Sequence, residues 1–179
     1  EAVPAPIQLA RLHGIVAALA RAGAIVSIDT RLAEVAAPLL DDGARIVNDV
    51  SGLEDPAMAG VVARAGAGLV VMHMRGTPRT MQDDPRYLDL FGEIRAFLAD
   101  RIARATAAGV ARAAIAVDPG VGFGKTAADN LRLIAGLGFL TPLGAPILVG
   151  LSRKSFLGTI DAGRTTAERL EGSLAASVI

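Results

Sequence analysis

Short apolar runs alternate with helical patterns along this chain, and several runs end on a polar residue. The runs occupy residues 25–28, 44–47, 68–71, 114–117 and 146–149. Three of them lead directly into side chains that bind ligands well: Asp29, then Asn48 with Asp49, and Asp118. Near-continuous apolar strands are typical of parallel sheets covered on both faces. We therefore predict an α/β protein with about five parallel strands joined through helices.

The segments between these runs carry apolar residues at helical spacing. The predicted helices and their faces are a first helix with Leu9, Leu12, Val16 and Leu19 that ends at Gly23; one with Val35, Leu39 and Leu40; a short one from Asp55 through Val62 to Gly66; the longest, with Leu90, Ile94, Phe97 or Leu98, and Ile102; one over 129–140; and a last one from Arg164 to the chain end with Leu170, Leu174 and Val178 in register.

Two architectures fit this alternation, a doubly wound sheet and a (β/α)8 barrel. A whole barrel takes about 250 residues, whereas this chain has 179 residues. It begins with a helical pattern and has five candidate strands, so as a barrel it would be incomplete. The length suits one domain, predicted over residues 1–179.

Charge and composition exclude several classes of partner. Lys plus Arg and Asp plus Glu number 18 each, so the net charge is zero. A nucleic-acid partner usually requires a basic excess, and none is expected here. No apolar run reaches the roughly 18 residues of a membrane span, and the start has no signal-peptide pattern. The absence of cysteine fits a cytoplasmic protein.

The loop after the fourth run is rich in glycine. Gly120, Gly122 and Gly124 alternate with other residues, and Lys125 and Thr126 follow. A nucleotide P-loop needs a glycine five residues before the Gly-Lys-Thr triplet, where this chain has proline. The spacing is also not the dinucleotide fingerprint. We therefore do not predict a nucleotide site at this loop.

The polar strand ends predict one ligand pocket. In parallel α/β sheets, ligands bind at the carboxyl ends of the strands. An unpaired carboxylate such as Asp118 at the end of a buried strand is costly unless something binds it.

Simpler interpretations remain open for individual residues. Asp29 and Asp49 could cap turns, and Arg153 with Lys154 could be a solvated basic pair. His73 more often fills a hydrogen-bonded strand-end position than binds a metal.

Five blocks of sequence together carry a family resemblance. They are Ser27-Ile-Asp-Thr30; Ile46-Val-Asn-Asp49; Met72-His-Met-Arg-Gly76 with Pro78 and Thr80-Met-Gln82; Asp118-Pro-Gly-Val-Gly-Phe-Gly-Lys125; and Gly150-Leu-Ser-Arg-Lys-Ser155. In order and spacing they resemble dihydropteroate synthase, the folate-pathway enzyme inhibited by sulfonamides. The resemblance implies a (β/α)8 barrel that condenses dihydropterin-hydroxymethyl diphosphate with p-aminobenzoate, giving dihydropteroate and diphosphate.

The resemblance also implies roles for particular residues. The family assigns pterin recognition to the positions of Asp29, Asn48, Asp118 and Lys154. A carboxylate such as Asp118 can accept the two adjacent donors on one pterin edge, a strong charge-assisted pairing. Asn48 offers both a donor and an acceptor, and Lys154 could donate to the ring carbonyl. Apolar walls for the ring would come from Met72, Leu148, Gly150 and Phe123.

Catalysis in this family is thought to begin with departure of diphosphate. The developing pterin cation would be stabilised electrostatically by Asp29, with Lys154 as the second catalytic residue. Ser155, near a helix start, could hold the aminobenzoate carboxylate, and Phe123 would also contact that substrate.

The chain departs from the family at both ends. The family's Mg²⁺-binding Asn would lie before residue 1, so Mg²⁺ is an expected cofactor with no metal ligand predicted within this chain. The Thr-Arg-Pro loop and the last Arg-x-His strand have no counterpart either. The sequence also begins with Glu1 rather than methionine. We expect a fragment that turns over poorly alone, from a protein that commonly forms homodimers.

Two alternatives belong to other functional classes. A methyltetrahydrofolate-dependent methyltransferase would share the Asp and Asn pterin contacts, but it has no need for the aminobenzoate-facing segment Ser152-Arg-Lys-Ser155. A catalytically silent paralogue or interaction module would keep the fold without the reaction. Sulfonamide competition would separate the first alternative from the synthase, and pterin binding without turnover would favour the second.

Overall fold

The computed structural model describes residues 3–77, 80–81, 83, 85–160 and 163–178. Pro78 and Gln82 of the third sequence block lie outside the described residues. The chain divides into two compact units. The first consists of Glu1–Met72 with Leu98–Val117, and the second of His73–Phe97 with Asp118–Ile179.

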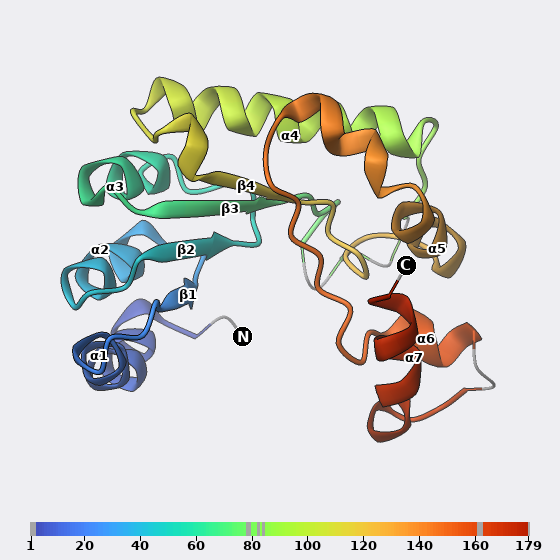
Figure 1. Cartoon of the computed structure of the whole chain (residues 1–179), viewed down its shortest axis with the longest axis horizontal. Helices are drawn as coiled ribbons and strands as arrows, with labels where there is room; N and C mark the ends of the chain where they lie inside the picture. The colour runs from blue at the N-terminus through green and yellow to red at the C-terminus, as the bar shows by residue number, and fades with distance from the viewer. Residues whose placement is uncertain (1–2, 78–79, 82, 84, 161–162, 179) are drawn as a thin grey trace. The chain divides into compact units, whose positions relative to one another are not determined.

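An open parallel sheet forms the centre of the first unit. Its strands are β1 (Ser27–Asp29), β2 (Ile46–Asp49), β3 (Gly68–Met72) and β4 (Ile115–Asp118), in the order β1-β2-β3-β4 (Figure 1). β1 pairs in parallel with β2, and β2 with β3. The predicted α/β class is therefore confirmed, with four strands rather than five.

The predicted apolar face of the second helix in the first unit is confirmed. α2 (Ala33–Asp41) buries Val35 and Leu39 completely. These residues are four apart and so lie on one side of the helix. α2 packs against α1 (Ala5–Arg21) and α3 (Met58–Ala65). α3 ends at Gly66, whose φ of +61° is a left-handed conformation that glycine adopts without strain.

Along one face of the longest helix, α4 (Leu90–Ala107), every fourth residue is buried. Leu90, Ile94, Leu98 and Ile102 are each no more than 8% exposed. Burial of such side chains contributes about 1.5–3 kcal/mol each, which explains why the face was readable from spacing alone. A 3₁₀ turn, η1 (Arg112–Ala114), then leads into β4.

The second unit is mostly short helices. They are α5 (Ala127–Ala135), the 3₁₀ helix η2 (Leu137–Leu143), α6 (Ser155–Ile160), the 3₁₀ helix η3 (Thr166–Arg169) and α7 (Leu170–Ala176). Thr126 caps α5, its hydroxyl accepting from the Asp129 N–H. The helix predicted over 129–140 is thus two helical elements, and the helix start predicted near Ser155 is confirmed by α6.

The fifth predicted strand, residues 146–149, does not form. Only Ile147 makes an isolated bridge, and Leu148 is 41% exposed. Pro146 has no N–H to donate to a ladder. An apolar run becomes a strand only when the backbone of a neighbouring strand hydrogen-bonds to its N–H and C=O groups. Among the described residues, this segment has no such ladder of hydrogen bonds.

Two predicted helix faces are also wrong. In α1, Val16 is buried but Leu19 is 46% exposed. At the chain end the predicted single helix is divided into η3 and α7. Its supposed core face points to solvent, because Leu170, Leu174 and Val178 are 48%, 59% and 86% exposed.

Candidate functional site

Three of the predicted pterin residues share one face of the sheet in the first unit. β1 and β2 pair with Asp29 opposite Asn48, and Asn48 lies opposite Val70 of β3. Side chains alternate along a strand, so Met72, two residues beyond Val70, lies on the same face. The Asn48 Nδ2 donates to a carboxylate oxygen of Asp29 at 3.2 Å. The structure therefore brings Asp29, Asn48 and Met72 to one face.

Asn48 keeps an unused acceptor. Its Oδ1 is buried and has no hydrogen-bond partner among the described residues. A buried acceptor without a donor is costly, about 1–3 kcal/mol. A ligand N–H at this position would remove that cost, as the predicted pterin contact requires.

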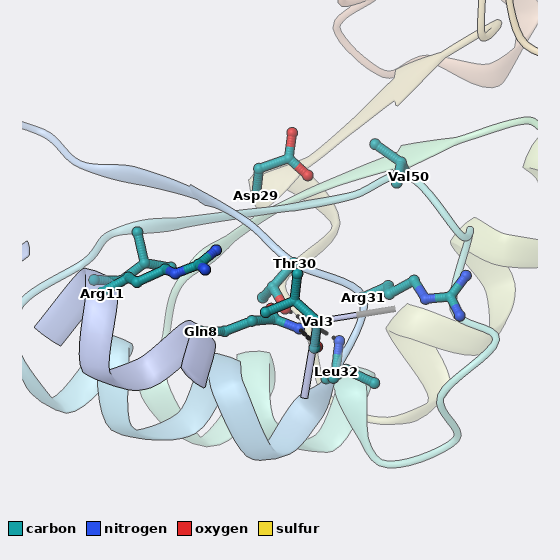
Figure 2. A pocket seen from close by; sticks show the side chains of 9 residues that line it. Val3, Gln8, Arg11, Asp29, Thr30, Arg31, Leu32 and Val50 are labelled. Atoms are coloured by element: carbon teal, nitrogen blue, oxygen red, sulfur yellow. Dashed lines mark hydrogen bonds between the residues drawn. The ribbon is translucent and has the colours of Figure 1, made fainter. Parts of the chain in front are cut away.

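An open cavity of about 480 Å³ lies beside Asp29 (Figure 2). It is formed by the start of the chain, α1 and the segment after β1; Gln8, Arg11, Thr30 and Leu32 are among its lining residues. Asp29 itself is exposed. The Gln8 amide is already occupied by the Val3 carbonyl at 2.7 Å.

Asp49 has a structural role. Its carboxylate is completely buried and accepts from the Ser51 N–H at 2.9 Å, the Ser51 hydroxyl at 2.6 Å and the Leu53 N–H at 2.8 Å. These bonds hold the turn after β2, where Leu53 has a φ of +63°. The turn-capping interpretation is confirmed for Asp49.

Asp118 is the central carboxylate of the second unit. It is 7% exposed, and its Oδ1 accepts from the Gly120 N–H at 2.7 Å. Burial raises the pKa of Asp118, while the Gly120 hydrogen bond and the positive charges of Lys154 and Lys125 act to lower it. A buried carboxyl group with a perturbed pKa and two neighbouring cations is a candidate ligand-binding group.

The loop after Asp118 needs its glycines. Gly120 has φ +70°, and a Cβ there would collide with the His73 carbonyl oxygen. Gly124 has φ +63°, and a Cβ would lie 2.7 Å from the Arg75 carbonyl oxygen. The loop is thus closely packed against the segment that begins at His73.

Lys154 and Phe123, each predicted to contact the pterin, lie against each other. The Lys154 Nζ lies 4.0 Å from the centre of the Phe123 ring, a cation–π contact. Burial lowers the pKa of Lys154, and the Asp118 charge acts to raise it. Lys154 is therefore not a solvated surface lysine.

The turn before Lys154 is held by its neighbours. Arg153 has a φ of +49°, a strained value for a non-glycine residue. Its N–H donates to the Ser173 hydroxyl at 2.7 Å, and its carbonyl accepts from Arg169 at 3.3 Å. These bonds stabilise the backbone that presents Lys154.

The remaining predicted residues of the second unit are exposed. Gly150 has open space where a Cβ would stand, which leaves room for a flat ring. Ser155 is the first residue of α6. Its expected contact with a carboxylate stays a prediction.

The sequence interpretation did not place Lys125 in the site, and it took His73 for a hydrogen-bonded strand-end residue, which the structure confirms. Lys125 is 2% exposed and His73 is 6% exposed. The Lys125 Nζ lies 3.1 Å from His73 Nδ1 and donates to the Phe123 carbonyl at 2.8 Å. Burial lowers the pKa of Lys125 to about 7 and that of His73 to about 3. One signal was available: Lys125 and Lys154 are the only two lysines in the chain.

Among the described residues, no three His, Asp or Glu side chains come together to hold a metal ion. Among the described helices, none is both long and apolar enough to cross a membrane.

Strand-end carboxylates, an orphaned amide oxygen and a glycine-rich loop define a ligand-binding α/β protein. Residues 1–179 match the family of pterin binding enzymes, and the chain belongs to that family. It is similar to the dihydropteroate synthase of Mycobacterium leprae, with 46% identity over 165 residues, 91% of this chain and 58% of that protein.

Solved structures give the same fold. A Yersinia pestis dihydropteroate synthase with a sulfonamide drug complex is 37% identical with a TM-score of 0.95, covering 99% of this chain and 65% of that one. A Xanthomonas albilineans dihydropteroate synthase in complex with 7,8-dihydropteroate is 37% identical with a TM-score of 0.90, covering 99% and 65%. The chain therefore spans less than two thirds of the length of these relatives.

Proposed function

We propose that the protein is a dihydropteroate synthase, a transferase that joins dihydropterin-hydroxymethyl diphosphate to p-aminobenzoate. The observation that carries this proposal is the environment of Asp118. Its buried carboxylate is hydrogen-bonded to the loop that follows it, and the charges of the chain's only two lysines act to lower its pKa. The 46% identity to the Mycobacterium leprae synthase supports the same reaction. So does the Xanthomonas structure with dihydropteroate, the product of this condensation.

Each set of residues has a distinct task in this scheme. Asp118 accepts the amide-like N–H and the exocyclic amine of the pterin, a bidentate pairing that favours the ionised carboxylate. Lys154 donates to the ring carbonyl, and Phe123 offers an aromatic face. Asn48 Oδ1, which lacks a partner among the described residues, accepts a ring N–H.

The chemical step exchanges a carbon–oxygen bond for a carbon–nitrogen bond. The bond between the pterin methylene and the diphosphate oxygen breaks, and oxygen keeps the electron pair. The nitrogen lone pair of p-aminobenzoate then attacks the pterin cation, and that nitrogen releases a proton to solvent. Asp29, an exposed carboxylate on the accessible face of β1, stabilises the developing positive charge. Ser155 and Phe123 contact the aminobenzoate.

Mg²⁺ stays an expected cofactor in this proposal. A cytoplasmic homodimer is part of the proposal. The exposed apolar residues of the last helix, Leu170 and Leu174, support a partner surface there. Sedimentation analysis of the wild type and Leu174→Glu tests it: a dimer that the substitution dissociates is expected, and a monomeric wild type would contradict it.

The deciding experiment is calorimetric titration of the chain with a pterin that lacks diphosphate. Binding by the wild type and none by Asp118→Asn, both with native circular dichroism, is the expected result. A folded wild type that binds no pterin would refute the assignment. Competition between p-aminobenzoate and a sulfonamide then separates a synthase from a pterin-binding methyltransferase, for which no competition is expected.

A further inference from the structure

Lys125 follows the glycine-rich loop in the sequence, and its ammonium bonds both to that loop and to His73. Its Nζ lies 2.8 Å from the Phe123 carbonyl oxygen, 3.1 Å from His73 Nδ1 and 3.4 Å from the His73 carbonyl oxygen. A Cβ added at Gly120 would lie 3.3 Å from the same Nζ. The ammonium is therefore enclosed by the loop and by His73.

The number of donors matches the number of acceptors. A protonated lysine has three N–H donors and no acceptor, and three acceptors surround this one. His73 can serve as one of them, because its lowered pKa of about 3 keeps the ring neutral near pH 7. The backbone N–H of His73 donates to the backbone carbonyl of Asp118 at 2.9 Å. Lys125 thus links Phe123 to His73, which is itself bonded to Asp118.

Phe123 and Asp118, which Lys125 and His73 connect, both have a role in the proposed function. Phe123 presents its ring to Lys154, and Asp118 is the pterin anchor. We propose that Lys125 is a positioning residue of the pterin site, which holds the loop backbone at Phe123 and, through His73, the end of β4 that carries Asp118. This inference rests on the proposed function.

The electrostatics give Lys125 a second effect. The charged groups that act on it are Asp118 and Asp129, which raise its pKa, and Lys154, which lowers it together with burial. The resulting pKa of about 7 means that Lys125 loses its proton as the pH rises through neutrality. Deprotonation leaves two donors for three acceptors and removes a positive charge that favours ionised Asp118. The loop should therefore loosen above pH 7.

Hydrogen exchange tests the positioning without any ligand. Lys125→Met keeps the apolar length of the side chain and removes the ammonium. We expect faster exchange of the amides over residues 120–124 in this variant, and unchanged exchange in Arg21→Met, which alters an exposed residue at the end of α1. Protection at the loop equal to that of the wild type would overturn the inference.

Calorimetry against pH tests the consequence for binding. We expect Lys125→Met to bind pterin about ten- to a hundredfold more weakly than the wild type at pH 6.5, the effect of losing hydrogen bonds to a charged group. The difference should shrink by pH 8.5. The pterin's own titration affects both proteins equally. The change with pH in the ratio of their two dissociation constants therefore isolates the effect of Lys125.

The outcomes separate this inference from the proposed function. Pterin binding that Asp118→Asn abolishes, but that Lys125→Met leaves unchanged at every pH, would overturn the role of Lys125 alone. A wild type that binds no pterin refutes the proposed function, and hydrogen exchange still decides the positioning. If Lys125→Met does not fold, Lys125→Gln, which keeps a donor without the charge, replaces it in both measurements.

Discussion

The ammonium of Lys154 lies 4.0 Å from the centre of the Phe123 ring. Both residues were predicted from sequence to face the pterin. A partly desolvated cation over an aromatic face is worth about 0.5–2 kcal/mol. The contact restrains the Lys154 side chain. The charge of that side chain also acts to lower the pKa of Asp118.

Replacing the ring tests this contact. We expect Phe123→Leu to weaken p-aminobenzoate or sulfonamide binding by about 1 kcal/mol or more, since the variant loses an aromatic surface and leaves Lys154 less fixed. Phe139→Leu is the matched control, because Phe139 packs on Phe91 with ring centres 4.8 Å apart. Calorimetric titration with a sulfonamide measures both. Equal affinity in the two variants would argue against a ligand role for Phe123.

The two lysines can be titrated individually. With lysine labelled in ¹³C and ¹⁵N, the chain should give only two side-chain signals by NMR, from Lys125 and Lys154. One signal should change near pH 7, because burial lowers the pKa of Lys125 to about 7. The other should titrate below the ordinary range for lysine. Lys125→Met assigns the signals, and two signals that titrate near 10.5 would contradict the buried environment.

Asp118→Asn should stabilise the fold while it abolishes pterin binding. The pKa of Asp118 is raised in the folded state, mainly by burial. The unfolded state therefore releases this proton at a lower pH, and the contribution of Asp118 to stability is lost as the pH rises through its folded pKa. At pH 7 the ionised carboxylate is a cost that asparagine avoids.

Urea unfolding measures the difference. We expect a gain of about 0.5–2 kcal/mol for Asp118→Asn at pH 7, the usual range when a functional residue is replaced by one that suits the fold better. The gain should shrink toward pH 4, as the wild-type carboxyl becomes protonated. A loss of stability at pH 7 would show that Asp118 serves the fold rather than the ligand.

Asp49 should behave in the opposite way. Its buried carboxylate accepts three hydrogen bonds from Ser51 and Leu53. Asp49→Ala leaves three donors without their acceptor, and we expect a loss of about 3 kcal/mol in the free energy of unfolding. Asp49→Asn should lose less, because one oxygen remains. Thermal unfolding checks both, and a stable Asp49→Ala variant would contradict the turn-capping role.

The prediction from sequence worked where burial is periodic. The faces of α2 and α4 were readable because Val35 and Leu39, or Ile94 and Leu98, recur every four residues and are completely buried. The residues Asp29 and Asn48 were readable because each follows directly on an apolar run, and the parallel register then places them opposite each other.

The prediction from sequence was wrong where spacing says nothing about partners. Residues 146–149 have the composition of a strand but no ladder among the described residues, and Leu174 has helical spacing but an exposed side chain. Lys125 was missed because its neighbour His73 is 52 residues away in the sequence. Such tertiary hydrogen bonds leave no periodic signal.

Gly120→Ala tests how closely the loop packs. Gly120 has a φ of +70°, which costs a residue with a side chain about 1–3 kcal/mol. The added methyl would also collide with the His73 carbonyl oxygen and come within 3.3 Å of the Lys125 Nζ. We expect a loss of stability of about 2–4 kcal/mol in urea unfolding, within the range of a strained and crowded site. Gly138→Ala is the matched control in the same unit, since nothing lies within 4 Å of its added Cβ and its φ is not left-handed. Equal stability of the two variants would show that the loop moves away from His73 at little cost, and that the bonds of Lys125 do not hold it there.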